Sequence, residues 1–380
     1  MRYLTVFSEP FRAMFLLASL AATLVPMFFI CFLVSDYTYY GEYFDMTDWH
    51  IHEMLFGFTS ALLSGFILTA GAHWANTESY GIKAILPLSL LWVLERLALF
   101  YPFFSKQITF SFGVLFSLLL LILVVNLVRK NRKISFALGV FFTVFGLSKF
   151  LFSWGALVEN VAYTETGKVI ALGLIRVIIA AVAGKVIPFF LSKKAPKAFE
   201  EIPFKLNLLC VIPLILLIPY PYYPVSIQVF LSLFCLITNL YRYMRWKPLH
   251  TRKFPMLWIL YVAYAFMLLH LLSLALEPFF PILLNGTITT HLLTSGLLGI
   301  MGLGIMGRVV LGHTGREIRA DRWMIFMYLA TLLGAVMRVL IPLIAFDHYY
   351  PALHSTMGFW TLGYLVFFFR FFKTLVTPRI

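Results

Sequence analysis

The sequence is poor in charged residues and in cysteine. Only 12% of its 380 residues are Asp, Glu, Lys or Arg and 61% are hydrophobic, and a soluble protein of this length could not bury so much apolar surface. The three cysteines, Cys31, Cys210 and Cys235, all lie within apolar runs and form no paired pattern. We therefore expect no disulfide framework and interpret these cysteines as packing residues.

Polar stretches long enough for a soluble domain are also missing. The chain instead contains twelve apolar runs of about the length that crosses a membrane as a helix, joined by short segments. We predict an all-α polytopic membrane protein in which residues 1–380 form a single transmembrane domain. The predicted spans are 11–34, 50–72, 82–101, 108–128, 134–155, 167–191, 204–219, 222–243, 256–278, 286–311, 323–345 and 351–373.

The net charge of +14 is distributed unevenly along this topology. Basic residues in 129–133 and 242–253 fall on one side of the membrane, whereas Asp45, Asp48 and Glu159 fall on the other. The positive-inside rule then places both termini in the cytoplasm. Because topology explains the basic runs, we expect contact with the lipid bilayer and no nucleic-acid partner.

The most informative motif is Trp-His-Ile-His-Glu at residues 49–53, at the outer end of the second span. Ionisable residues in a membrane are costly and by default indicate function, and imidazole is a common ligand of haem iron, copper and zinc. His52 and His291 lie at matching depth on two spans of equal direction, so we interpret both as metal ligands. On a helix, His50 would lie about 200° around from His52, so it would serve a second centre or simply pack.

Other polar residues in the outer half of the spans offer partners for a cofactor. Arginine suits carboxylates such as haem propionates. We interpret four residues as cofactor-binding: Glu53, Arg96, Arg176 and Arg338. Alternatively, Arg96 and Arg338 pair with carboxylates or backbone carbonyls of the protein. His270 is a weaker metal candidate, because a lone membrane histidine most often hydrogen-bonds a neighbouring helix.

A second polar group lies at the predicted cytoplasmic ends of the spans. Its members are His73, Trp74, Lys185, His313 and Arg316. They could form a pocket for an anion, a quinone head or a second metal, with His313 as a ligand. Alternatively they are interfacial anchors, and residues 313–316 form a helix C-cap with Gly312 or Gly315 in the left-handed conformation.

Two of the spans resemble each other. His52, Gly57 and Gly65 match His291, Gly296 and Gly304 with identical spacing. The span that follows each of them carries an arginine in its outer half. The sixth predicted span, 167–191, runs in the same direction as the second and the tenth. Because these spans are each four apart, the pattern suggests three four-helix units.

Several motifs together resemble the NnrS family of bacterial membrane proteins. They are Trp-His-Ile-His-Glu-Met-Leu-Phe-Gly at 49–57, Lys-Val-Ile-Pro-Phe-Phe at 185–190, and Arg-Val-Val-Leu-Gly-His-Thr-Gly-Arg at 308–316. The resemblance covers nearly the whole chain. It implies a protein of the bacterial inner membrane that contains haem and copper and is linked to nitric oxide metabolism. By motif match it points to His50, His52, Glu53, Arg96, His291, His313 and Arg316.

The sequence also departs from that family. It has His73 where the family usually has asparagine, Lys185 where it usually has arginine, and Tyr261 where a histidine is common. An altered or depleted metal centre would follow if that histidine is a ligand in relatives. The repeat and the outer histidines further resemble subunit I of haem–copper oxidases, which is an analogy of fold and does not assign oxidase activity.

These observations favour a haem-binding membrane protein, with copper as a second candidate metal, that acts in the response to nitric oxide and nitrosative stress. Its partners would be nitric oxide or another diatomic ligand and an unidentified electron donor, and the pattern leaves open whether the ligand is bound or turned over. The alternative is a secondary transporter or exporter of a small anion or metal complex, because internal repeats are common in transporters. A third reading is a structural or sensory membrane protein without metal.

Overall fold

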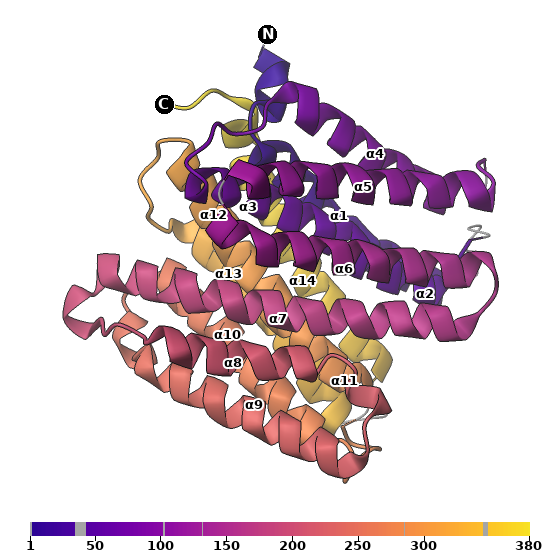
Figure 1. Cartoon of the computed structure of the whole chain (residues 1–380), viewed down its shortest axis with the longest axis vertical. Coiled ribbons are helices and arrows are strands. Elements are labelled where there is room, and N and C mark those ends of the chain that lie inside the picture. The colour runs from indigo at the N-terminus through magenta and orange to yellow at the C-terminus, as the bar shows by residue number, and fades with distance from the viewer. Residues whose placement is uncertain (1, 35–42, 102, 131, 285, 345–348) are drawn as a thin grey trace. The chain divides into compact units, whose positions relative to one another are not determined.

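The described part of the chain is helical and contains no β-strand. The structure is a computed structural model, and it describes residues 2–34, 43–101, 103–130, 132–284, 286–344 and 349–380 (Figure 1). The helices are α1 Pro10–Val34, α2 Met46–His52, α3 Thr59–Trp74, α4 Ile82–Phe100, α5 Lys106–Lys130, α6 Arg132–Leu157, α7 Val161–Lys194, α8 Phe204–Leu216, α9 Val225–Arg245, α10 Pro255–Leu276, α11 Gly286–His291, α12 Ile300–His313, α13 Arg322–Ile344 and α14 Tyr349–Val376.

Short segments of other helix types accompany them. The π-helical segment η2, Glu53–Phe58, joins α2 to α3, and the π-helical segment η6, Leu292–Gly299, joins α11 to α12. The 3₁₀ helices are η1 Arg2–Phe7, η3 Pro196–Ala198, η4 Tyr220–Tyr222 and η5 Pro248–Thr251. With α2–η2–α3 and α11–η6–α12 each counted as one continuous helix, every predicted span coincides with a helix, so the all-α fold is confirmed.

Within the described residues, ten helical stretches are long and apolar enough to cross a membrane. The predicted spans outside this set are α4 and α8. Helix α4 carries three charged residues, Lys83, Glu95 and Arg96. Helix α8 has only 13 residues, or about 20 Å at 1.5 Å per residue, which is shorter than a hydrocarbon core of about 30 Å.

The chain divides into two compact units. The first unit comprises Met1–Ala171, Met306–Ile318 and Tyr364–Ile380, and the second comprises Leu172–Ile305 and Arg319–Gly363. The predictions of one transmembrane domain and of three four-helix units stay predictions. Each unit is described below by itself.

Close contacts between helices organise each unit. In the first, α1 packs on α3 where a Cβ at Gly65 would come within 2.7 Å of the Phe15 ring. In the second, α10 packs on η6 and α12, where a Cβ at Gly304 would come within 2.9 Å of Leu260. Gly65 and Gly304 are matched positions of the repeat, and both admit a neighbouring helix.

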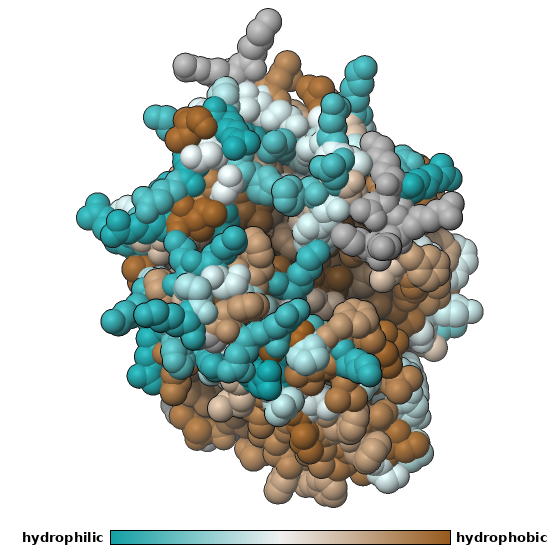
Figure 2. All heavy atoms as spheres, turned by 60° about the vertical axis from the view of Figure 1, so that its left-hand side comes forward, coloured by the Kyte–Doolittle hydropathy of each residue, from teal (hydrophilic) through white to brown (hydrophobic). Residues whose placement is uncertain are grey.

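The surface carries many large apolar side chains. Figure 2 shows broad brown areas on the face it presents, and exposed side chains include Ile122, Phe230 and Phe369. On a soluble monomer, exposed apolar patches of this extent are rare. With its long apolar helices, the chain is a multi-pass membrane protein in contact with lipid.

Candidate functional site

Both histidines that we interpreted as ligands lie where an α-helix becomes a π-helix. His52 ends α2 directly before η2, and His291 ends α11 directly before η6. A π segment inserts an extra residue into a turn and is frequent at functional sites. The sequence repeat therefore coincides with a repeated and uncommon backbone feature.

Five ionisable side chains meet around His52 in the first unit: His52, Glu53, Glu95, Arg96 and Lys149. Four of them have side chains no more than 4% exposed, and Arg96 is 13% exposed. Lys149 on α6 lies 2.7 Å from both carboxylate oxygens of Glu95 on α4. The Arg96 guanidinium donates to Glu95 Oε2 at 2.6 Å and to Glu53 Oε2 at 3.2 Å. Two carboxylates thus balance two cations in the interior, and we call this group the charge network.

His52 is held at one nitrogen by the charge network. Its Nδ1 lies 3.0 Å from Glu53 Oε1, whereas its Nε2 lies 3.6 Å from Glu95 Oε1, beyond hydrogen-bond length. The carboxylate at Nδ1 favours the proton on that nitrogen, so the lone pair of the neutral ring lies on Nε2. Histidines that bind metals are commonly oriented in this way by a carboxylate or a carbonyl.

Two glycines make room for the charge network. A Cβ on Gly113 of α5 would come within 2.5 Å of Glu95 Oε1, and a Cβ on Gly57 within 3.2 Å of Arg96 and Glu53. Trp92 closes the same region, donating from its indole to the Gly57 carbonyl at 3.0 Å and stacking under the Arg96 guanidinium at 4.5 Å. The network is therefore built by α2, η2, α4, α5 and α6 together.

His50 lies in different surroundings from His52. Its ring stacks on Phe29 of α1 with centroids 4.2 Å apart, whereas the ring of His52 faces Phe44, Phe56 and Phe152. The prediction that the two rings leave the helix in different directions is confirmed.

His291 has an acceptor at the same nitrogen as His52. Its Nδ1 lies 2.7 Å from the carbonyl oxygen of Thr287, one turn earlier in α11. A carbonyl can only accept, so Nδ1 carries the proton and the lone pair of the neutral ring lies on Nε2. Both candidate ligands therefore have an acceptor at Nδ1, which is a carboxylate in the first unit and a backbone carbonyl in the second.

Arg176 and His270 pair with each other in the second unit. Arg176 Nη1 donates to His270 Nε2 at 3.1 Å, and His270 Nδ1 donates to the Thr289 carbonyl at 2.9 Å. Arginine has no acceptor, so Nε2 must be the accepting nitrogen here. His270 thus has both nitrogens engaged, which favours the helix–helix role over the ligand role. Arg338 is buried on α13 of the same unit.

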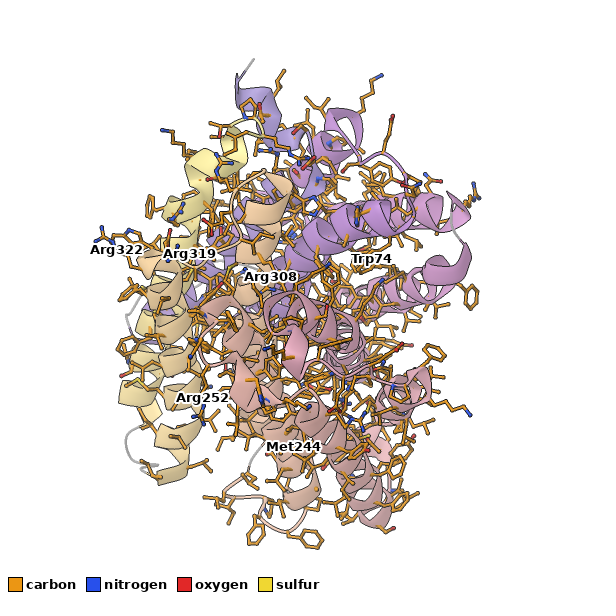
Figure 3. All side chains as sticks on the ribbon, turned by 90° about the vertical axis from the view of Figure 1, so that its left-hand side faces the viewer. Trp74, Met244, Arg252, Arg308, Arg319 and Arg322 are labelled. Atoms are coloured by element: carbon orange, nitrogen blue, oxygen red, sulfur yellow. The ribbon has the colours of Figure 1, made fainter. Side chains whose placement is uncertain are left out.

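Of the second polar group, predicted at the cytoplasmic ends of the spans, residues 313–316 form the helix C-cap that was one of the two alternatives. Gly315 has a φ of +80°, and the Arg316 amide donates to the Leu311 carbonyl at 2.9 Å, so residues after His313 form a left-handed C-cap. The His313 ring packs beside Phe11 with centroids 5.6 Å apart. Figure 3 places Trp74 at the end of α3 and Arg308 on α12, both in the first unit.

Among the described residues, no group of three or more His, Cys, Asp or Glu side chains is arranged to hold a metal ion. The sequence pattern brought His52, Glu53 and Arg96 to attention. It did not identify the partnership of Glu95 with Lys149, whose positions on separate spans give no spacing signal.

The comparison with known proteins agrees with the motifs. The model of the protein family described as "NnrS protein" matches residues 5–379, essentially the whole chain. The chain belongs to the NnrS family. No curated protein matches this NnrS-family chain.

Proposed function

We propose that this chain is a haem-binding protein of the bacterial inner membrane that acts in the response to nitric oxide, with both termini in the cytoplasm and copper as a second candidate metal. The observation that carries the proposal is that His52 and His291 each have Nδ1 beside an acceptor and each lie directly before a π-helical segment. Membership of the NnrS family supports the same class of function.

The residues of the first unit suit a haem ligand. His52 would coordinate through Nε2, while Glu53 at Nδ1 fixes the ring and strengthens its electron donation. Arg96 holds Glu53 in place and is the cation of the charge network nearest to solvent, so it suits a propionate. Arg176 and Arg338 are the corresponding cations of the second unit, and His50 would be an additional ligand. A bound haem would supply an iron that takes up a diatomic molecule.

The test is the haem content of the purified full-length protein after haem-supplemented expression, read from reduced-minus-oxidised absorbance spectra. Near-stoichiometric haem is expected in the wild type and in His250→Ala, because His250 is an exposed residue of η5. His52→Ala and His291→Ala are expected to retain less than a tenth of it, and nitric oxide is expected to shift the wild-type spectrum. A colourless wild type, or equal spectra in all four proteins, would contradict the proposal.

A further inference from the structure

Helix α9 of the second unit buries polar side chains and exposes apolar ones, which is the reverse of the pattern in a soluble protein. Its buried residues are all polar or cysteine: Ser232, Cys235, Thr238, Asn239 and Arg242. Its exposed residues include Phe230, Ile237 and Met244, and Figure 3 labels Met244 on this helix. Spacings of three and four residues place the buried set on one helical face. In a membrane protein this means that the polar face of α9 lines the interior.

Neighbouring helices add polar groups to the same interior. Helix α8 contributes Asn207 and Cys210, α10 contributes Tyr264 and His270, and α7 contributes Arg176. Asn239 links several of them, because its amide donates to the carbonyls of Cys210 and Cys235 while its Oδ1 accepts from Tyr264 and Arg242. We call this group the α7–α10 interior.

Arg242 carries a positive charge in the α7–α10 interior, and its side chain is fully buried. Its guanidinium donates to Asn239 Oδ1 at 3.0 Å, to the Ala180 carbonyl at 3.1 Å and to Asn207 Oδ1 at 3.3 Å, and it also contacts the Tyr264 hydroxyl. All of these partners are neutral. Arg176 likewise donates only to His270 and to the Leu217 carbonyl.

Among the described residues, no carboxylate forms an ion pair with either of these two cations. Among the described residues of the second unit, no Asp or Glu is fully buried, and the two buried carboxylates of the described chain, Glu53 and Glu95, belong to the first unit. Burying a charge is strongly unfavourable unless an opposite charge accompanies it. In addition, Arg176 Nε, Arg242 Nε and Ser232 Oγ are buried without a hydrogen-bond partner in the structure.

We propose that the α7–α10 interior binds a small planar oxoanion at Arg242, with Arg176 as a second positive charge further along the same interior. The guanidinium fork matches the geometry of carboxylate, nitrate and nitrite. Gly184 of α7 leaves room for the Arg242 and Asn207 side chains, because a Cβ there would come within 2.8 Å of Arg242 Nη1 and 2.9 Å of Asn207 Oδ1. The oxoanion is either a free ion or the carboxylate of a bound organic group such as haem.

The first arm of the test does not depend on the proposed haem. Thermal unfolding of the haem-free full-length protein is measured with increasing nitrate or formate, at ionic strength kept constant with chloride, which is not a planar oxoanion. The wild type is expected to show a saturable rise in Tm, since a ligand that binds only the folded state stabilises it. Arg242→Gln is expected to lose the rise, and Arg252→Gln to keep it, because Arg252 is exposed in the α9–α10 connection (Figure 3).

The variant Arg242→Lys tests whether Arg242→Gln loses the nitrate effect only because it misfolds. It keeps the charge and loses the planar fork, so it is expected to weaken the effect of nitrate on Tm at least tenfold. The second arm compares haem content: a fall in Arg242→Gln assigns the oxoanion to a haem carboxylate, and an unchanged content assigns it to a free ion. The absence of any nitrate or formate effect in the wild type, or an equal effect in Arg242→Gln, would overturn the proposal.

Discussion

The charge network of the first unit and the α7–α10 interior of the second bury charge in opposite ways. In the first, Glu53 and Glu95 are enclosed together with Arg96 and Lys149, and the charge network is internally neutral apart from His52. In the second, Arg176 and Arg242 are enclosed with neutral partners, and no carboxylate is fully buried among the described residues. A balanced network is suited to hold and orient a ligand side chain, whereas an unbalanced one is suited to receive an anion.

Removing a carboxylate from the balanced network is expected to give the largest effect. Glu95→Gln would leave Lys149 and Arg96 with a single buried carboxylate, which should destabilise the first unit by about 3–5 kcal/mol. Its unfolding can be followed by denaturant titration in detergent. The double variant Glu95→Gln with Lys149→Met restores the balance and should recover much of the loss. Equal stability of the single variant and the wild type would show that the charges are not energetically coupled.

Alanine at the matched glycines Gly57 and Gly296 should lower the stability of the protein by different amounts. In Gly296→Ala the new Cβ would lie within 2.2 Å of the Phe266 ring, which must shift, at a cost of about 1–3 kcal/mol. In Gly57→Ala the nearest atoms, at 3.2 Å, are the ends of Arg96 and Glu53, so the loss should be smaller. Both are read from thermal unfolding. A larger loss at Gly57 would reverse the order that the packing predicts.

Arg12 offers a test confined to the first unit. Its Nη1 donates to the carbonyls of Thr374, Leu375 and Thr377 at distances from 2.7 to 3.3 Å, so it caps the end of α14. Arg12→Met should cost about 1.5–3 kcal/mol, as for a hydrogen-bonded charged group, and speed hydrogen exchange in the last turns of α14. Exchange at α9 serves as the internal control and should be unchanged. Unaltered exchange at α14 would mean that the cap is not needed.

The smallest predicted effect is the pH response at Glu277, just after α10 in the second unit. Partial burial raises the pKa of Glu277, and the Thr289 hydroxyl hydrogen bond opposes this rise. An acid whose pKa is raised on folding favours the folded state at low pH, and this contribution is lost as pH rises through the raised pKa. Glu277→Gln should therefore flatten the dependence of Tm on mildly acidic pH. An unchanged dependence would assign it to another group.

Much of the helical frame could be predicted from the sequence because long apolar runs determine it. The ends of α5, α9 and α13 agree with the predicted spans to within three residues. Helix α8 ended three residues before its predicted end, after Pro213 and ahead of the prolines around Tyr220. The π segments after His52 and His291 could not be predicted, because one extra residue in a helical turn leaves no trace in composition.

The site could be predicted only in part. The pairing of Arg96 with Glu53 and Glu95 was one of two alternatives predicted for Arg96, and the structure contains this pairing. The ion pair of Lys149 with Glu95 could not be predicted, because the sequence does not tell which face of α6 meets α4. Arg242 was interpreted as a topology signal because it lies within a basic run, whereas the spacing of Ser232, Cys235, Asn239 and Arg242 on one helical face would have indicated a buried position.

The role of His52 as a haem ligand is tested most directly by a redox titration of the haem absorbance in the wild type and in Glu53→Gln. If His52 is a haem ligand oriented by Glu53, replacing the carboxylate with a neutral amide weakens the donation of the imidazole. A higher midpoint potential is expected in Glu53→Gln, and an unchanged one in Glu200→Gln, because Glu200 is exposed. Identical potentials in all three proteins, or a wild type without haem, would contradict this role of His52.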